Sequence, residues 1–151
     1  MGADSFWGSR PRESIAAACS QRGTGDVIAG CLTLIHGGDV DPGLIVALAG
    51  PASVRFLDAP PDQRYWLRVW GVRGLLWALD APGAPTTDTT AAISVALGDE
   101  HWRVREMAAK VAARHRLDAA QPALVPLLAD ETARVRTAAA RALRLLSADP
   151  G

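Results

Sequence analysis

The chain has 151 residues, of which 16 are basic and 16 acidic, and it is 49% apolar and 21% charged. A chain of this length can bury a core without disulfides or metal, and its composition excludes a disordered tail. The balanced charge argues against a strongly basic nucleic-acid binder, the apolar run at 43–50 is too short for a membrane span, and no signal peptide pattern opens the sequence. The expectation is a soluble cytoplasmic protein.

Helical periodicity dominates the sequence, because apolar residues recur at intervals of three and four while alternating β-branched runs are scarce. Proline and glycine turns divide the pattern. Residues 1–10 are expected to form a flexible N-terminal segment, and residues 51–60 and 81–87 long connections, the first with room for a short turn at 53–57. The eight expected helices cover residues 11–21, 25–36, 42–49, 62–79, 88–97, 101–115, 120–129 and 132–147.

Capping residues agree with these divisions. Asp41 before Pro42 predicts an N-cap with proline in the first helical position. Side chains at five further positions are placed to accept hydrogen bonds from the first N–H groups of a following helix, namely Thr24, Asp62, Asp88, Asp99 and Asp130.

The second half of the chain contains an internal repeat. Residues 99–111 match residues 130–142 at an offset of 31, with Asp, Glu, Arg, Val, Arg and two Ala in register. Residues 62–73 fit the same frame at an offset of 37, and Gly71 then aligns with Ala108 and Ala139. One helical hairpin cannot bury its apolar face alone, so this repeat predicts hairpins that stack and share a core.

The spacing of Asp, five residues, Arg, with an apolar residue before the Arg and Ala three and four residues after it, resembles the HEAT repeat and the related lyase-type HEAT-like repeats. The resemblance implies an all-α fold, a short right-handed α-solenoid of about four antiparallel hairpins in one domain, 11–151. The repeats would span about 11–39, 40–80, 88–116 and 118–148. The first is degenerate, because Ile28 occupies the Arg position.

In this family the Asp and Arg of the repeat motif form a ladder, in which the Asp of one repeat bonds into the next repeat. The resemblance therefore implies a structural role, and no catalytic one, for Asp62, Arg68, Asp99, Arg105, Asp130 and Arg136.

The second helix of each hairpin would line a concave groove and carry a polar stripe. Two interpretations of this stripe stay open: a solvated face, or a positive groove with aromatic anchors for an acidic partner. Trp66 and Trp77 either line that groove or pack beneath residues 51–60, whereas Trp70 and Trp102 are expected at core edges. The candidate partner-binding residues are Trp66, Arg73, Trp77, Arg103, Lys110, Arg114, Arg134 and Arg141.

Searches for chemistry give no catalytic arrangement, metal site or cofactor motif, and His36, His101 and His115 lack ligand spacing. The hypothesis is a non-enzymatic module that binds a protein partner, of unknown identity and oligomeric state. The alternative is a nucleic-acid-binding protein related to HEAT-like alkylpurine DNA glycosylases, with Trp66, Trp77 and Asp80 beside Arg73; a chromophore-lyase relative is a third.

Arginine supplies 15 of the 16 basic residues, with Lys110 the exception. Two explanations for this bias stay open: a GC-rich bacterial genome, and selection for arginine at sites of bidentate hydrogen bonding or aromatic stacking.

Overall fold

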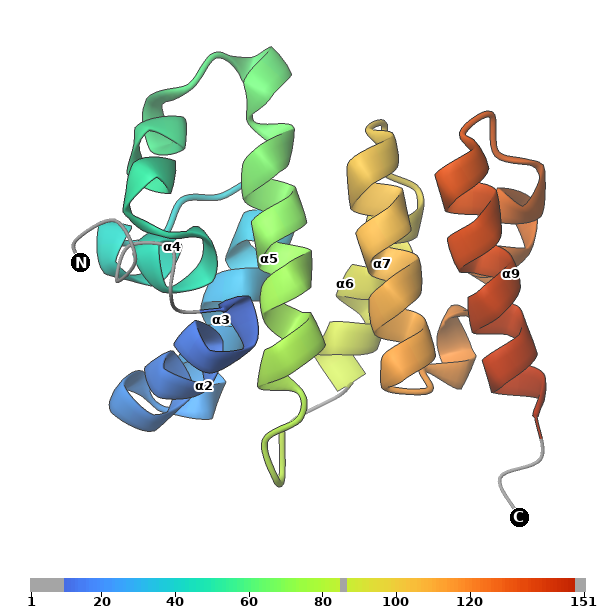
Figure 1. Cartoon of the computed structure of the whole chain (residues 1–151), viewed down its shortest axis with the longest axis horizontal. Helices are drawn as coiled ribbons and strands as arrows, with labels where there is room; N and C mark the ends of the chain where they lie inside the picture. The colour runs from blue at the N-terminus through green and yellow to red at the C-terminus, as the bar shows by residue number, and fades with distance from the viewer. Residues whose placement is uncertain (1–9, 85–86, 149–151) are drawn as a thin grey trace. The chain divides into compact units, whose positions relative to one another are not determined.

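A computed structural model describes residues 10–84 and 87–148, and within these ranges every regular element is helical (Figure 1). The chain divides into two compact units, Met1–Pro85 and Thr86–Gly151, and the boundary falls in the connection predicted at 81–87. The predicted single domain stays a prediction. Residues 1–9, most of the segment expected to be flexible, lie outside the described residues.

The first unit contains α2 (Pro11–Arg22), α3 (Thr24–Ile35), α4 (Pro42–Ala49) and α5 (Tyr65–Ala78), so the four predicted helices lie within three residues of their expected bounds. Residues 51–60 are more ordered than a connection with one short turn. They form the 3-10 helix η1 (Pro51–Asp58), and η2 (Pro61–Gln63) follows. The buried Ser53 Oγ donates to the Gly50 carbonyl and lies 3.3 Å from the Ile45 carbonyl, which ties η1 to the end of α4.

The core of the first unit depends on a close approach between α3 and α5, which lie side by side in Figure 1. Gly71 and Gly74 are buried on one face of α5. A Cβ at Gly71 would lie 2.9 Å from the Cys31 carbonyl oxygen and 2.9 Å from Leu34 Cβ, and one at Gly74 would lie 2.4 Å from Cys31 Sγ. Two glycines therefore set the distance between the helices, and any larger side chain at Gly71 meets backbone.

The predicted N-cap at Asp41 is confirmed. Its side chain accepts a hydrogen bond of 3.0 Å from Leu44 N–H, and Pro42 occupies the first turn of α4. Arg22, in the last turn of α2, donates to both carboxylate oxygens of Asp41 and also pairs with Asp26 at 2.9 Å. The start of α4 is thereby fixed to the end of α2 and the start of α3.

The Asp41 carboxylate gives the first unit a pH-dependent stability. Hydrogen bonds from Arg22 lower the pKa of Asp41 from 3.8 to about 2. A lowered folded-state pKa stabilises the fold above the unfolded value, and that contribution is lost as the pH falls from about 4 toward 2. Asp41→Asn keeps an oxygen that can cap Leu44 but removes the charge. We therefore expect urea denaturation to show the variant less stable at pH 7 and equal to the parent near pH 2; a constant difference would contradict this assignment.

The other predicted caps were wrong. Thr24 is the first residue of α3, and its N-cap is Gly23, which has no side chain to cap the helix. Asp88 lies inside α6 (Thr87–Leu97), and Asp62 lies in η2. Asp99 and Asp130 accept instead from the N–H groups of His101 and Thr132, at 2.8 and 2.9 Å, each residue lying just before a helix begins. These two aspartates thus close the turns that precede the two helices. The N-cap of the helix at 102–114 is His101, whose Nδ1 accepts a hydrogen bond of 3.2 Å from Arg103 N–H.

The second unit consists of two helical hairpins. The first pairs α6 (Thr87–Leu97) with α7 (Trp102–Arg114). The second pairs α8 (Gln121–Leu124) and the 3-10 helices η3 (Asp118–Ala120) and η4 (Val125–Ala129) with α9 (Ala133–Ser147), and α9 packs beside α7 (Figure 1). The helix predicted at 120–129 is broken after Leu124, because Pro126 cannot donate a backbone hydrogen bond to continue it, whereas Pro122 lies in the first turn of α8.

The internal repeat is visible in the packing of the second unit. Val104, Ala108 and Val111 of α7 are fully buried, as is each residue 31 positions later on α9, namely Val135, Ala139 and Ala142. Small side chains at these positions allow close helix packing. None of the helices within the described ranges is long and apolar enough to cross a membrane.

Candidate functional site

Arg105 joins the two repeats of the second unit. Its Nε lies 2.8 Å from one carboxylate oxygen of Asp130, and its Nη2 lies 3.2 Å from the other. Its Nη1 donates to the Asp99 carbonyl at 2.8 Å, so one guanidinium spans its own repeat and the next. The side chains of Arg105 and Asp130 are only 12% and 7% exposed, which places the pair inside the interface.

The electrostatics of Asp130 follow from this pairing. Burial alone raises the pKa of a carboxyl group, but hydrogen bonds from Arg105 and from the Thr132 N–H outweigh burial and hold the pKa of Asp130 below its ordinary value. The carboxylate is therefore charged and satisfied in the folded state. Loss of Arg105 would leave that charge buried without its guanidinium partner.

The other residues predicted for the ladder are placed as follows. Arg136 donates to the Asp130 carbonyl at 2.6 Å, which repeats the bond from Arg105 to Asp99. Asp62 is exposed in η2, and Arg68 is half-buried on α5. The structural role of all six residues stays a prediction that substitution can test.

One side of α5 carries a stripe of large side chains at intervals of four, three and four: Trp66, Trp70, Arg73 and Trp77. Trp70 is nearly buried and packs edge-on against Phe56 of η1, with ring centroids 5.3 Å apart, and Trp66 stacks on Trp70 at 6.0 Å. Trp77 lies under the guanidinium of Arg12 from α2, at 5.5 Å. Trp66 and Trp77 are both half-buried, and it is Trp70 that contacts residues 51–60 directly.

Arg73 is more enclosed than a groove-lining charge would be. Its Nη2 donates to the Leu48 carbonyl at the end of α4, at 2.8 Å. Its Nε is buried and has no acceptor among the described residues, and burial lowers the pKa of its guanidinium. The positive charge lies at the C-terminal end of α4, where a helix dipole favours a cation.

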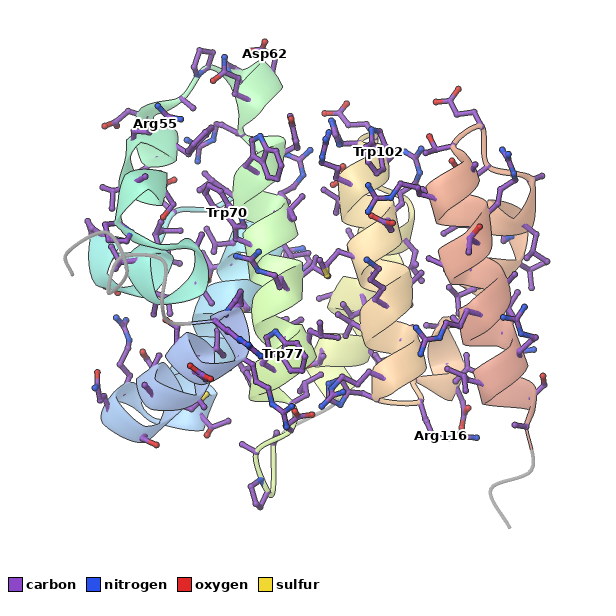
Figure 2. All side chains as sticks on the ribbon, viewed as in Figure 1. Arg55, Asp62, Trp70, Trp77, Trp102 and Arg116 are labelled. Carbon is purple, nitrogen blue, oxygen red and sulfur yellow. The ribbon has the colours of Figure 1, made fainter. Side chains whose placement is uncertain are left out.

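The exposed side of α7 and α9 carries a second cluster, centred on Trp102 (Figure 2). Two guanidinium groups stack on its indole ring, Arg103 at 4.5 Å and Arg134 at 5.4 Å. The Glu106 carboxylate, only 12% exposed, lies 2.9 Å from Arg134 Nε and 3.8 Å from Lys110 Nζ. Arg134 itself is 66% exposed, so its charge stays accessible to solvent.

Three of the predicted groove residues, Arg103, Lys110 and Arg134, thus lie on or beside this cluster, and Arg114 and Arg141 are exposed farther along the same two helices. Trp102 and Glu106 were not predicted as binding residues, although helical spacing places Glu106 on the same polar stripe as Arg103 and Lys110. Trp102 was assigned to a core edge, although its position next to Arg103 and its alignment with Ala133 beside Arg134 were readable signals. Because the predicted rows run across both compact units, the partner-binding role of the full set stays a prediction.

Within the described residues no group of three or more His, Cys, Asp or Glu side chains is placed to hold a metal ion. Burial raises the pKa of the Cys31 thiol to about 12 and also raises that of Cys19. Both thiols are therefore protonated at neutral pH and are poor nucleophiles.

The family model for HEAT repeats matches residues 61–144, more than half of the chain. The chain belongs to the HEAT repeat family. The match covers α5 to α9 and includes the repeat register described above, so the predicted all-α fold of HEAT-type hairpins is confirmed. No curated protein and no solved structure matched the chain.

HEAT repeats generally mediate protein–protein interactions, and the family typically serves as a non-catalytic scaffold. In this HEAT repeat protein the exposed side of α7 and α9 carries tryptophan, arginine and lysine side chains.

Proposed function

We propose that this chain is a non-catalytic interaction module that binds an acidic surface of a protein partner. The binding surface is the α7–α9 face, defined by Trp102, Arg103, Lys110, Arg134 and Arg141. The observation that carries the proposal is the stacking of Arg103 and Arg134 on Trp102 at the start of α7. Tryptophan and arginine dominate the binding energy of many protein interfaces.

Charge supports an acidic partner. The α7–α9 face has four positive side chains, and Glu106 is the acidic side chain paired with two of them. Stacking on Trp102 also holds two long arginine side chains near one geometry, so less conformational entropy is lost when a carboxylate binds them.

Arg114, on α7, extends the proposed surface. Trp66, Arg73 and Trp77 form a second candidate surface, on α5, in which the two tryptophans offer apolar contact and Arg73, whose guanidinium is half-buried, a positive field. Cytoplasmic residence is part of the proposal: Cys19 and Cys31 are both free thiols, as is usual in a reducing compartment.

The proposal is tested by reversing two charges on the face. Lys110 and Arg141 are exposed, and changing both to Glu reverses two charges with the loss of one ion pair, that of Lys110 with Glu106 at 3.8 Å. A photo-crosslinking residue at Lys110 first identifies the partner in host cell extract, and titration calorimetry then measures the purified complex. We expect Lys110→Glu with Arg141→Glu to weaken binding at least ~30-fold, from ~2 kcal/mol of lost electrostatic complementarity.

The matched control is Arg10→Glu with Arg55→Glu, which changes the net charge equally at exposed positions that belong to neither α7 nor α9. Far-UV circular dichroism of both double variants should match that of the parent. Full affinity in the Lys110 and Arg141 variant, or equal loss in the control, would refute the α7–α9 face.

A labelled single- or double-stranded oligonucleotide tests the alternative. Binding by phosphate contacts weakens steeply as salt rises, so tight binding at low salt with a steep salt slope would favour a nucleic-acid protein. We expect none, because Trp66 and Trp77 are engaged by Trp70 and Arg12.

A further inference from the structure

The guanidinium of Arg73, in the first unit, has no counter-ion among the described residues. It makes one hydrogen bond with them, from Nη2 to the Leu48 carbonyl at 2.8 Å. Its Nε is buried without an acceptor, whereas Nη1, which also has no acceptor among the described residues, is open to solvent. A charge that is partly removed from water and left without a neutralising partner is costly, and such a group in a folded protein requires an explanation.

The repeat register shows which partner Arg73 lacks. Lys110, the aligned residue 37 positions later, has Glu106 four residues before it, and their charged atoms lie 3.8 Å apart. The residue aligned with Glu106 is Val69, which is buried. The C-terminal end of α4 offsets the charge of Arg73 only in part, because a helix dipole is equivalent to about half an elementary charge. The repeat that contains Arg73 therefore leaves a place for a carboxylate that it does not fill itself.

The surroundings of Arg73 restrict the chemistry of a ligand. Trp70 and Trp77 lie one helical turn on either side of Arg73 on α5 (Figure 2), and the guanidinium of Arg12 lies 5.5 Å from the centroid of the Trp77 ring. These neighbours are apolar or positive, so they favour an anion with apolar groups beside it. A carboxylate carries the single negative charge that neutralises one guanidinium, whereas a phosphate group carries about two and commonly binds several cations or N–H donors.

We propose that Arg73 is the anchor of a binding site for a carboxylate side chain of a partner protein, an aspartate or glutamate with apolar neighbours. The carboxylate accepts hydrogen bonds from Arg73 Nη1, and its apolar neighbours pack on the exposed parts of Trp66 and Trp77. This inference rests on the second candidate surface proposed above, on α5, and is independent of the α7–α9 face.

The probe is the peptide acetyl-Ala-Leu-Glu-Leu-Ala-amide, which holds one carboxylate between two leucines and has no charged terminus. The matched control peptide has Gln in place of Glu. NMR of the ¹⁵N-labelled chain follows the Nε–H of Arg73, because burial slows its exchange with water. We expect the Glu peptide to shift this signal and the Trp77 indole N–H saturably, and the Gln peptide to bind at least ~10-fold more weakly.

Variants of the chain assign the site. Arg73→Lys should remove the Nε–H signal and weaken binding of the Glu peptide at least ~5-fold, since lysine keeps the charge but lacks the planar guanidinium. Arg55→Lys, at an exposed position of η1, is the matched control and should bind as the parent does. Lys110→Glu with Arg141→Glu should also bind the peptide normally, which separates a failure of this site from a failure of the α7–α9 face.

Equal binding of the Glu and Gln peptides would overturn the proposal, and this comparison uses the parent chain, so it does not depend on the folding of a variant. Normal binding to Arg73→Lys would overturn it too, as would the absence of a saturable shift up to ~10 mM peptide. A larger shift of Arg73 Nε–H with inorganic phosphate than with acetate at equal ionic strength would assign a different ligand. Self-association of the parent that Arg73→Lys abolishes would make a second copy the occupant, and either result rejects the proposed one.

Discussion

Arg105→Ala is expected to lower the free energy of unfolding of the second unit by about 3 kcal/mol. The substitution removes two hydrogen bonds to Asp130 and one to the Asp99 carbonyl. It also leaves a carboxylate that is 7% exposed without its cation, and this desolvated charge is the larger part of the cost. Urea denaturation followed by Trp102 fluorescence and far-UV circular dichroism measures the change.

Arg136→Ala is the matched control, since Arg136 occupies the same register but bonds only to the Asp130 carbonyl. Its cost should stay below about 1 kcal/mol. Arg103→Ala removes a stacked, half-buried side chain and should also cost less than Arg105→Ala. Equal losses in all three variants would show that the ladder register does not stabilise the repeats.

Gly71→Val is expected to destabilise the first unit by about 3 kcal/mol. The new Cβ would lie 2.9 Å from the Cys31 carbonyl oxygen and from Leu34 Cβ, and backbone atoms of a packed helix cannot move aside. The higher helix propensity of valine offsets only a few tenths of a kcal/mol. Thermal melting should show an earlier transition.

Gly25→Ala is the control that raises helix propensity without creating a steric clash. Gly25 lies in the first turn of α3, and a Cβ there meets nothing within 4 Å. The substitution should therefore stabilise the chain by about 0.5 kcal/mol. If Gly71→Val melts with the parent, α3 and α5 are not held at the distance described.

The candidate site was predictable in part. The alignment of residues 99–111 with 130–142 predicted Arg103, Lys110, Arg134 and Arg141, because aligned residues of two repeats lie on the same face of their helices. The contacts of Arg134 with the Trp102 ring and the Glu106 carboxylate did not follow, since Arg134 belongs to another helix. Arg73 shares its register with Lys110, yet its guanidinium reaches the Leu48 carbonyl, an acceptor 25 residues away.

The sequence by itself determined the helices of both units apart from those at 51–58 and 118–129, since apolar periodicity and proline or glycine breaks are local properties. It also determined the repeat register that places Arg105 and Arg136 in equivalent positions. Tertiary structure alone decided which of the two finds a carboxylate, because that depends on whether another helix packs beside each arginine. It also decided that Gly71 sets the α3–α5 distance and that Asp99 and Asp130 lead into helices without capping them. These outcomes depend on contacts between residues distant in the chain, and local patterns carry no information about such distances.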